Sequence, residues 1–292
     1  MDLARIGIRW TIGDVSEVGF ETLRLSIIGV SNVFEENADY AVCVNTISIK
    51  AARERTGRLP VLVQWVNAAG FLPGWLRNFV GSDMAEGVAW KLCPVRLFPQ
   101  QYELSLDNDV ILWSVPAAMK SWLESDARDA CLLAEDVHPA AGQFAPDVGA
   151  EALNSGIRGF APGMDIETRL FDFLRKSGHV LQSELDEQGL QAAVLSRRTL
   201  FKVGIEDVSI CSAFPMHRQA LGRCGVHFVG INRKTMPWIL NGRPGHHATC
   251  ENWLRWHPQV VQRISKDDGK RRKRYTFSRQ LVNDMAARKG RS

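Results

Sequence analysis

Strand-like and helical segments alternate at the start of the chain, and this order constrains the fold more than any other feature. Residues 5–11 alternate apolar and polar side chains, as a strand does, and residues 40–44 and 59–66 form further short apolar runs. Between the first two runs, residues 19–33 carry apolar side chains at the spacing of one helix face. Strands separated by helices form parallel sheets through crossover connections. We therefore expect an α/β protein with a mixed, mostly parallel sheet flanked by helices.

The same kinds of segment continue along most of the chain. The patterns predict strands at residues 103–113, 130–134, 153–160 and 225–231, and helices at residues 117–124, 166–178 and 186–195. Residues 88–97 fit a helix until Pro94 interrupts it. Beyond about residue 244 the pattern weakens. The simplest division is one α/β domain over residues 1–245 and a helical, basic extension over residues 246–292.

Composition places the chain among globular proteins. Of its 292 residues, 45% are apolar and 23% are charged, as in an ordinary domain. The longest nearly apolar run, residues 110–119, is too short to span a bilayer, and the N-terminus lacks the pattern of a secretory signal. Six cysteines without a C-x-x-C pair indicate reduced thiols and argue against a zinc ribbon. We therefore expect a cytoplasmic protein.

Basic residues are concentrated at the C-terminus. Residues 266–292 contain ten Lys and Arg against three Asp, whereas the chain as a whole has a net charge of only +4. One interpretation is a peripheral contact with the inner face of an anionic membrane. A second is nonspecific binding to nucleic-acid phosphates, and a third is a solvated terminus. The acidic body and the absence of a nucleic-acid-binding motif argue against a specific nucleic-acid partner.

Two carboxylates that follow a predicted strand are the strongest chemical signal. Asp107 and Asp109 come directly after the apolar-alternating residues 102–106. In extended backbone, residues two apart project from the same face, so both side chains point at one region. Their mutual repulsion is relieved by a divalent cation, and hard oxygen ligands suit Mg²⁺ or Mn²⁺. A solvated turn after a strand is the alternative.

Two further motifs fall where an open α/β sheet binds its ligands, at the carboxyl ends of strands. Asn154, Ser155 and Gly156 offer an amide, a hydroxyl and an open backbone that suit a polyhydroxyl ligand, and an ordinary turn is the alternative. His227 lies in an apolar run and is either a core residue or, if its strand runs beside the two aspartates, a third metal ligand.

The order of these motifs resembles that of the GT-A-fold nucleotide-sugar glycosyltransferases, most closely the glycogenin-like and lipopolysaccharide galactosyltransferase-like retaining family. The resemblance extends over residues 5–240. Four segments carry it, similar in turn to the family's LDxD, NSG, DQ and HFxG…KPW motifs: residues 106–110, 154–157, 187–191, and 225–230 with Pro237 and Trp238. It implies a Rossmann-like GT-A fold. It also implies a metal-dependent hexosyltransferase that moves a sugar from a nucleotide-diphosphate donor to a carbohydrate or lipid-linked acceptor.

The resemblance also assigns roles to residues. It implies that Asp107, Asp109 and His227 bind Mn²⁺ or Mg²⁺, and that Lys91 contacts the donor diphosphate. Asn154, Ser155 and Gly156 belong to the binding site for the sugar substrates. Glu187 and Gln188 lie by the anomeric carbon, although the first of them is an aspartate in the family. Two further departures are Lys234, three residues before Pro237, and the first strand, where Asp14 or Asn45 has to replace the family's nucleobase aspartate.

Other functions stay open at this point. A sugar nucleotidylyltransferase needs a glycine-rich loop for a triphosphate, and residues 11–15 contain one glycine. A noncatalytic binding protein would act through the basic tail. An inverting transferase would need a carboxylate base, for which Glu135-Asp136 and Glu206-Asp207 are available. His246-His247 is a weak metal pair, because adjacent side chains diverge.

Overall fold

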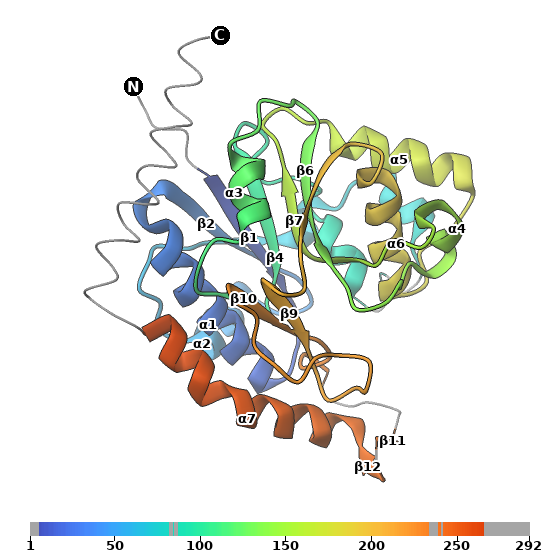
Figure 1. The fold of residues 1–292 in the computed structure, drawn as a ribbon. Coiled ribbons are helices and arrows are strands. Elements are labelled where there is room, and N and C mark those ends of the chain that lie inside the picture. Colours follow the sequence, from blue (N-terminus) through green and yellow to red (C-terminus); the bar gives the residue numbers. More distant parts are fainter. Residues whose placement is uncertain (1–5, 82–83, 85–86, 234–238, 241, 266–292) are drawn as a thin grey trace.

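A seven-stranded sheet forms the centre of the computed structural model, which describes residues 6–81, 84, 87–233, 239–240 and 242–265 (Figure 1). The strand order is β3-β2-β1-β4-β7-β6-β8. The bounds are β1 (Ile6–Ile12), β2 (Ala38–Val44), β3 (Gln64–Asn67), β4 (Tyr102–Asp107), β6 (Ala130–Glu135), β7 (Leu153–Phe160) and β8 (Thr199–Val203). β7 runs antiparallel to both its neighbours, and the other pairings in this sheet are parallel. The predicted mostly parallel α/β fold is confirmed.

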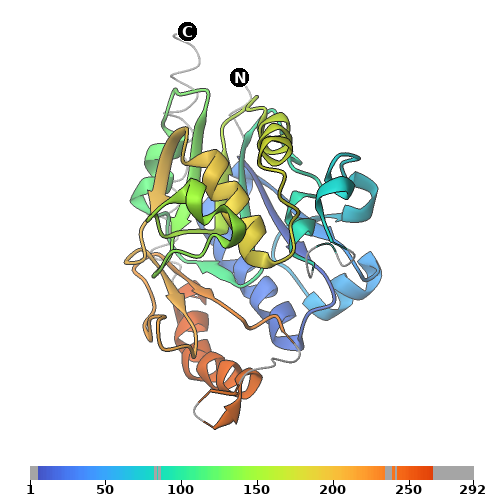
Figure 2. The same ribbon diagram turned by 90° about the vertical axis from the view of Figure 1, so that its right-hand side faces the viewer.

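Helices cover both faces of this sheet (Figures 1 and 2). One face packs against α1 (Glu17–Phe34), α2 (Ile49–Thr56) and α3 (Ala117–Leu123). The other packs against α4 (Ala145–Val148), α5 (Ile166–Ser177) and α6 (Glu184–Leu195). Neighbouring residues of a strand point to opposite faces, so in β2 Val42 and Val44 enter one core and Cys43 enters the other. A strand buried on both faces has a continuous apolar sequence, as residues 40–44 of β2 do.

A second, smaller sheet extends the edge of the molecule where the functional motifs lie. Its order is β5-β10-β9, with β5 (Val110–Leu112), β10 (Gly225–Phe228) and β9 (Val208–Cys211). Helix α7 (Gly245–Ser265) packs on it: Trp253 is buried against Phe228, with ring centroids 5.1 Å apart. Asn32 of α1 also donates a hydrogen bond of 2.8 Å to the Ile264 carbonyl. The predicted extension is therefore helical as far as Ser265, and its basic part, residues 266–292, lies outside the described residues.

Some predicted elements are confirmed and others are wrong in extent. The structure has helices within a few residues of those predicted at 19–33, 117–124, 166–178 and 186–195. It also has strands within a few residues of those predicted at 5–11, 40–44, 130–134, 153–160 and 225–231. Of residues 59–66, only those from Gln64 onward are β3, and of residues 88–97 only Val88–Leu92 are helical, as the 3₁₀ helix η4. α2, β8 and β9 went unpredicted. α2 buries only Ala52 and Thr56, so it has no apolar periodicity to find. No helix in the described ranges has the length and apolar character needed to cross a membrane.

Candidate functional site

Three predicted metal ligands meet where the large sheet passes into the small one. Asp107 ends β4, Asp109 lies in the turn between β4 and β5, and His227 lies on β10. β10 pairs with β5 so that His227 lies opposite Val110, and the Phe228 amide donates a hydrogen bond of 3.0 Å to the Asp109 carbonyl. One ligand atom from each of the three side chains lies within 4.8 Å of the other two. Nε2 of His227 is 3.3 Å from Oδ1 of Asp109 and 4.0 Å from Oδ2 of Asp107.

Two asparagines that the sequence analysis missed hold this turn in place. The amide of Asn108 donates hydrogen bonds to the Gly19 carbonyl of α1 and to Oδ1 of Asn232, at 2.9 and 2.6 Å. Asn232 in turn donates to Oδ2 of Asp109 at 3.0 Å. The middle residue of the Asp-x-Asp motif is thus a structural anchor, and it is buried together with Asp109. No sequence signal distinguishes Asn232, because its role depends on a contact with a distant turn.

The donor atoms of this group fit a divalent cation. Oδ1 of Asp109 is buried, has no hydrogen-bond partner among the described residues and lies 3.3 Å from Nε2 of His227. Two carboxylates and one imidazole are a donor set that Mn²⁺ accepts well. The surroundings also attract positive charge. Burial acts to lower the pKa of His227, but the Asp109 and Asp107 carboxylates outweigh burial, so the pKa is raised.

Lys91 reaches the same place from η4. Its ammonium group donates a hydrogen bond of 2.7 Å to Oδ2 of Asp107 and lies 3.7 Å from Oε2 of Glu187. Burial acts to lower the pKa of Lys91, but the two carboxylates outweigh burial and raise it, so the side chain carries its charge at neutral pH. The Lys91 carbonyl accepts a hydrogen bond from the fully buried Arg9, which fixes this segment beside the sheet.

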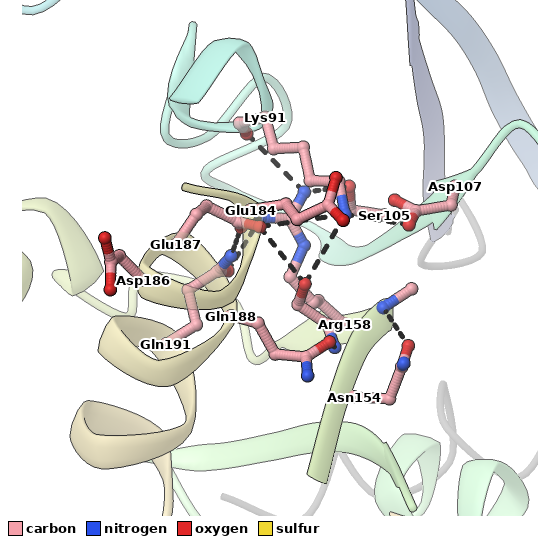
Figure 3. Close-up of polar contacts among 12 residues, drawn as sticks. Lys91, Ser105, Asp107, Asn154, Arg158, Glu184, Asp186, Glu187, Gln188 and Gln191 are labelled. Carbon is pink, nitrogen blue, oxygen red and sulfur yellow. Dashed lines mark hydrogen bonds and ion pairs between the residues drawn. The ribbon is translucent and has the colours of Figure 1, made fainter. Parts of the chain in front are cut away.

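Glu187 and Gln188 lie on the first turns of α6, which starts at a capping box formed by Ser183 and Asp186. Figure 3 shows Glu187 pointing toward Arg158 and Lys91, whereas Asp186 points away from them. Glu187 has no exposed surface, and its Oε1 is 3.6 Å from Nη1 of Arg158. Burial raises the pKa of Glu187, against Lys91 and Arg158, which act to lower it.

Gln188, by contrast, is partly exposed. Its Nε2 donates to the Ala140 carbonyl at 2.7 Å and its Oε1 accepts a hydrogen bond of 3.2 Å from the Ser155 amide. Of the two predicted catalytic residues, Gln188 is therefore the more accessible one. Arg158 and Gln191, which complete the Glu187 network, were not predicted, because both look like ordinary residues of a strand and a helix (Figure 3).

The Asn-Ser-Gly motif lies within β7 and is not a turn, and its side chains bond within the protein. Asn154 donates to Oδ2 of Asp136 at 2.8 Å, and Ser155 donates to Oε2 of Glu187 at 3.2 Å. Gly156 lies against His227: a Cβ atom there would be 2.5 Å from Cε1 of the imidazole. The glycine is thus needed for the close approach of a predicted metal ligand.

Replacing Gly156 with Ala is therefore expected to weaken Mn²⁺ binding. The added methyl group displaces the His227 ring, and a misplaced ligand or supporting residue typically costs roughly 10- to 100-fold in metal affinity. Isothermal titration with Mn²⁺ measures the effect. Gly74→Ala is the matched control, because a Cβ atom at Gly74 meets nothing within 4 Å. Equal Mn²⁺ affinities for wild type and the Gly156 variant would contradict this role.

The remaining sequence candidates have other partners or lie elsewhere. Asp14 forms an ion pair with Arg55 at 3.0 Å, and Asn45 bonds Thr46 at 3.0 Å. Glu206 and Asp207 pair with Arg218 and Arg223, at 2.7 and 2.8 Å. The rings of His246 and His247 lie 4.1 Å apart at the start of α7, but they belong to no metal-ligand group found among the described residues. Lys234, Pro237 and Trp238 lie outside the described residues.

Comparison with solved structures finds glycosyltransferases. The bifunctional glycosyltransferase WbbM, in its apo form, aligns with a TM-score of 0.55 and 13% identity over 90% of this chain and 52% of its own. The chain thus spans about half the length of WbbM. The galactosyltransferase LgtC, in complex with donor and acceptor sugar analogs, aligns with a TM-score of 0.49 and 14% identity. The alignment covers 92% of this chain and 99% of LgtC. The glycosyltransferase GlyE of Streptococcus pneumoniae aligns with a TM-score of 0.48 and 10% identity. The alignment covers 98% of this chain and 64% of GlyE.

No protein-family model matches the sequence, and no curated protein matches it. The likeness to WbbM, together with the strand order of the large sheet, confirms the predicted GT-A, Rossmann-like fold. At such low identity it bears on the fold alone.

Proposed function

We propose that the protein is a metal-dependent glycosyltransferase, which moves a sugar from a nucleotide-diphosphate donor to an acceptor hydroxyl. One observation carries the proposal: the ligand atoms of Asp107, Asp109 and His227, from two different sheets, lie within 4.8 Å of one another beside Lys91. The group lies at the carboxyl end of β4, where open α/β sheets bind ligands. The fold shared with WbbM is consistent with this activity.

In this proposal each charged residue has a defined task. Asp107, Asp109 and His227 hold Mn²⁺ or Mg²⁺, which when bound neutralises charge on the diphosphate leaving group. Lys91 lies where it can exchange its contact with Asp107 for a phosphate oxygen of the donor. Asp107 and Glu187 face the cations Lys91 and Arg158, whereas Asp109 faces His227. The paired carboxylates of Asp107 and Asp109 suit a cation that arrives together with an anionic donor.

Gln188 is the residue we assign to the reacting sugar. It is accessible, and its two hydrogen bonds to the Ala140 carbonyl and the Ser155 amide hold its side chain in place. Glu187 acts through others: its carboxylate orients Lys91 and Arg158. Positive charge held in place in this way would stabilise the negative charge that develops on the leaving diphosphate, without reorganisation during the reaction. Retention at the anomeric carbon rests on the resemblance of this segment to the retaining family.

A nucleotidylyltransferase finds no support at the loop after β1. Asp14 and Glu17 lie there, at the start of α1, and Arg55 is paired with both, at 3.0 and 2.6 Å. These carboxylates would repel a triphosphate at the helix N-terminus, where such folds bind it. A carbohydrate or lipid-linked acceptor, a cytoplasmic location and a membrane contact through residues 266–292 stay predictions of the sequence.

Thermal unfolding with nucleotides tests the proposed donor class. Each of UDP, GDP, CMP and dTDP is added with and without Mn²⁺, and the midpoint of unfolding is measured. We expect one nucleoside diphosphate to stabilise the protein only when Mn²⁺ is present, because a ligand at 100 times its dissociation constant adds about 2.7 kcal/mol. Equal midpoints in all samples would contradict the proposal.

A further inference from the structure

A second group of metal-ligating side chains lies beyond the residues assigned above. Asp136 directly follows β6, His138 lies two residues further along the same connection, and His217 lies in the loop after β9. One ligand atom from each lies within 4.8 Å of the other two. We propose that Asp136, His138 and His217 form a second divalent metal site, selective for Zn²⁺ or a similar transition metal. The proposal does not depend on glycosyl transfer.

The three side chains converge without bonding one another. Within the described ranges no hydrogen bond or ion pair joins the Asp136 carboxylate to either imidazole. The carboxylate instead accepts hydrogen bonds from Nδ2 of Asn154 and the Val137 amide, at 2.8 and 2.7 Å. Nδ1 of His138 is buried and has no hydrogen-bond partner among the described residues. Ligand atoms that converge without a direct hydrogen bond leave space between them for an ion.

Groups behind the ligands hold two of them in orientation. Oγ of the fully buried Ser212 lies 2.6 Å from Nδ1 of His217 and accepts a hydrogen bond of 3.0 Å from the Phe214 amide. With Nδ1 engaged by Ser212, Nε2 is the nitrogen of His217 that is left for a metal. Asn154 orients Asp136 in the same way. Partners of this kind fix the ring and its tautomer in metal sites.

The donor set distinguishes this group from the first one. It offers two imidazoles and one carboxylate, and imidazole nitrogen favours Zn²⁺ over Mg²⁺. Three protein ligands leave the fourth position of a tetrahedral Zn²⁺ ion open. Ligands at about 2.1 Å from the ion lie roughly 3.4 Å from one another, so binding draws the three side chains slightly together.

A Zn²⁺ ion here would join two loops that the sequence separates widely. It would tie the connection after β6 to the loop after β9. Asn154 links the Asp136 side to the first site: it donates to Asp136, and its Oδ1 accepts a hydrogen bond of 2.8 Å from the amide of Gly156, which packs on His227. The second site would therefore stiffen one wall of the first.

Zn²⁺ binding to untagged, full-length protein tests the proposal. Because Zn²⁺ also fits the first site, the measurements use the Asp109→Ala background, with stoichiometry from competition with a chromophoric chelator. We expect one equivalent in Asp109→Ala and its loss when His138→Asn or His217→Ala is added. Ser212→Ala should weaken binding roughly 10- to 100-fold without abolishing it. Bound Co²⁺ reports histidine ligation by its visible spectrum, and this signal should be lost with the same two variants.

His246→Ala is the matched control in that background. His246 lies one turn before the exposed Cys250 on α7, a spacing at which two side chains can bind one ion. Replacing His246 should leave the bound equivalent unchanged. Circular dichroism confirms that each variant is folded. The proposal is overturned if Asp109→Ala binds no Zn²⁺. It is also overturned if the added His138 and His217 substitutions leave the bound Zn²⁺ in place, or if the added His246→Ala substitution removes the bound Zn²⁺.

Discussion

Asp109→Ala is expected to abolish Mn²⁺-dependent binding of the nucleoside diphosphate and any transfer activity. Oδ1 of Asp109 is buried and has no hydrogen-bond partner among the described residues. It lies 3.3 Å from Nε2 of His227, another predicted metal ligand. Losing it leaves one carboxylate and one imidazole for the cation. We expect Mn²⁺ affinity to fall by roughly 100-fold or more, which corresponds to about 2.7 kcal/mol. Titration calorimetry measures this effect.

The fold should survive this substitution. Without Asp109, Lys91 and Arg158 keep their partners Asp107 and Glu187, and His227 keeps Asp107 at 4.0 Å, so no positive charge loses its last partner. The unfolding midpoint without ligands should stay close to that of wild type. Asp172→Ala is the matched control, because Asp172 lies on α5 with 45% of its side chain exposed and pairs only with Arg175 at 3.4 Å among the contacts described for it. Unchanged Mn²⁺-dependent binding in Asp109→Ala would remove the central support for the proposed function.

Glu103→Gln is expected to cause the largest loss of stability. Glu103 and Arg9 are both fully buried in neighbouring strands and form an ion pair of 2.9 Å, and Arg96 lies 3.5 Å from the other carboxylate oxygen. The substitution keeps the size of the side chain but leaves two guanidinium groups without a charged partner. Breaking a buried pair in this way costs about 3–5 kcal/mol. Urea denaturation measures the free energy of unfolding.

The exposed pair of Glu21 and Arg24 provides the comparison. Its atoms approach to 2.6 Å, closer than those of the buried pair, but about a third of each side chain is exposed. Glu21→Gln should therefore cost less than about 1 kcal/mol. If the two variants lose equal stability, burial is not what makes the Glu103 pair important. Arg9 also donates to the Lys91 carbonyl, so Glu103→Gln should loosen the Lys91 segment and weaken nucleotide binding as well.

Much of the fold followed from local sequence patterns. β2 and β6 contain near-continuous apolar runs, β1 and β4 alternate apolar and polar residues, and α1 and α5 carry apolar residues at helical spacing. α2 and β8 were not predicted. α2 buries few side chains, and β8 is an edge strand with exposed and half-buried residues along most of its length. Of the site, Asp107 and Asp109 could be read directly, since their common direction follows from their spacing in extended chain.

The order of most strands and helices along the chain, and the pair of aspartates, followed from local patterns, because strand and helix periodicity and the spacing of two near neighbours are local properties. That His227 lies beside the aspartates depends on the three-dimensional fold, since it requires β10 to pair with β5. It alone placed Glu187 out of solvent beside Arg158 and brought Asp136, His138 and His217 together. Such contacts join residues far apart in the chain, and their geometry is set by strand pairing and packing, which no local pattern encodes.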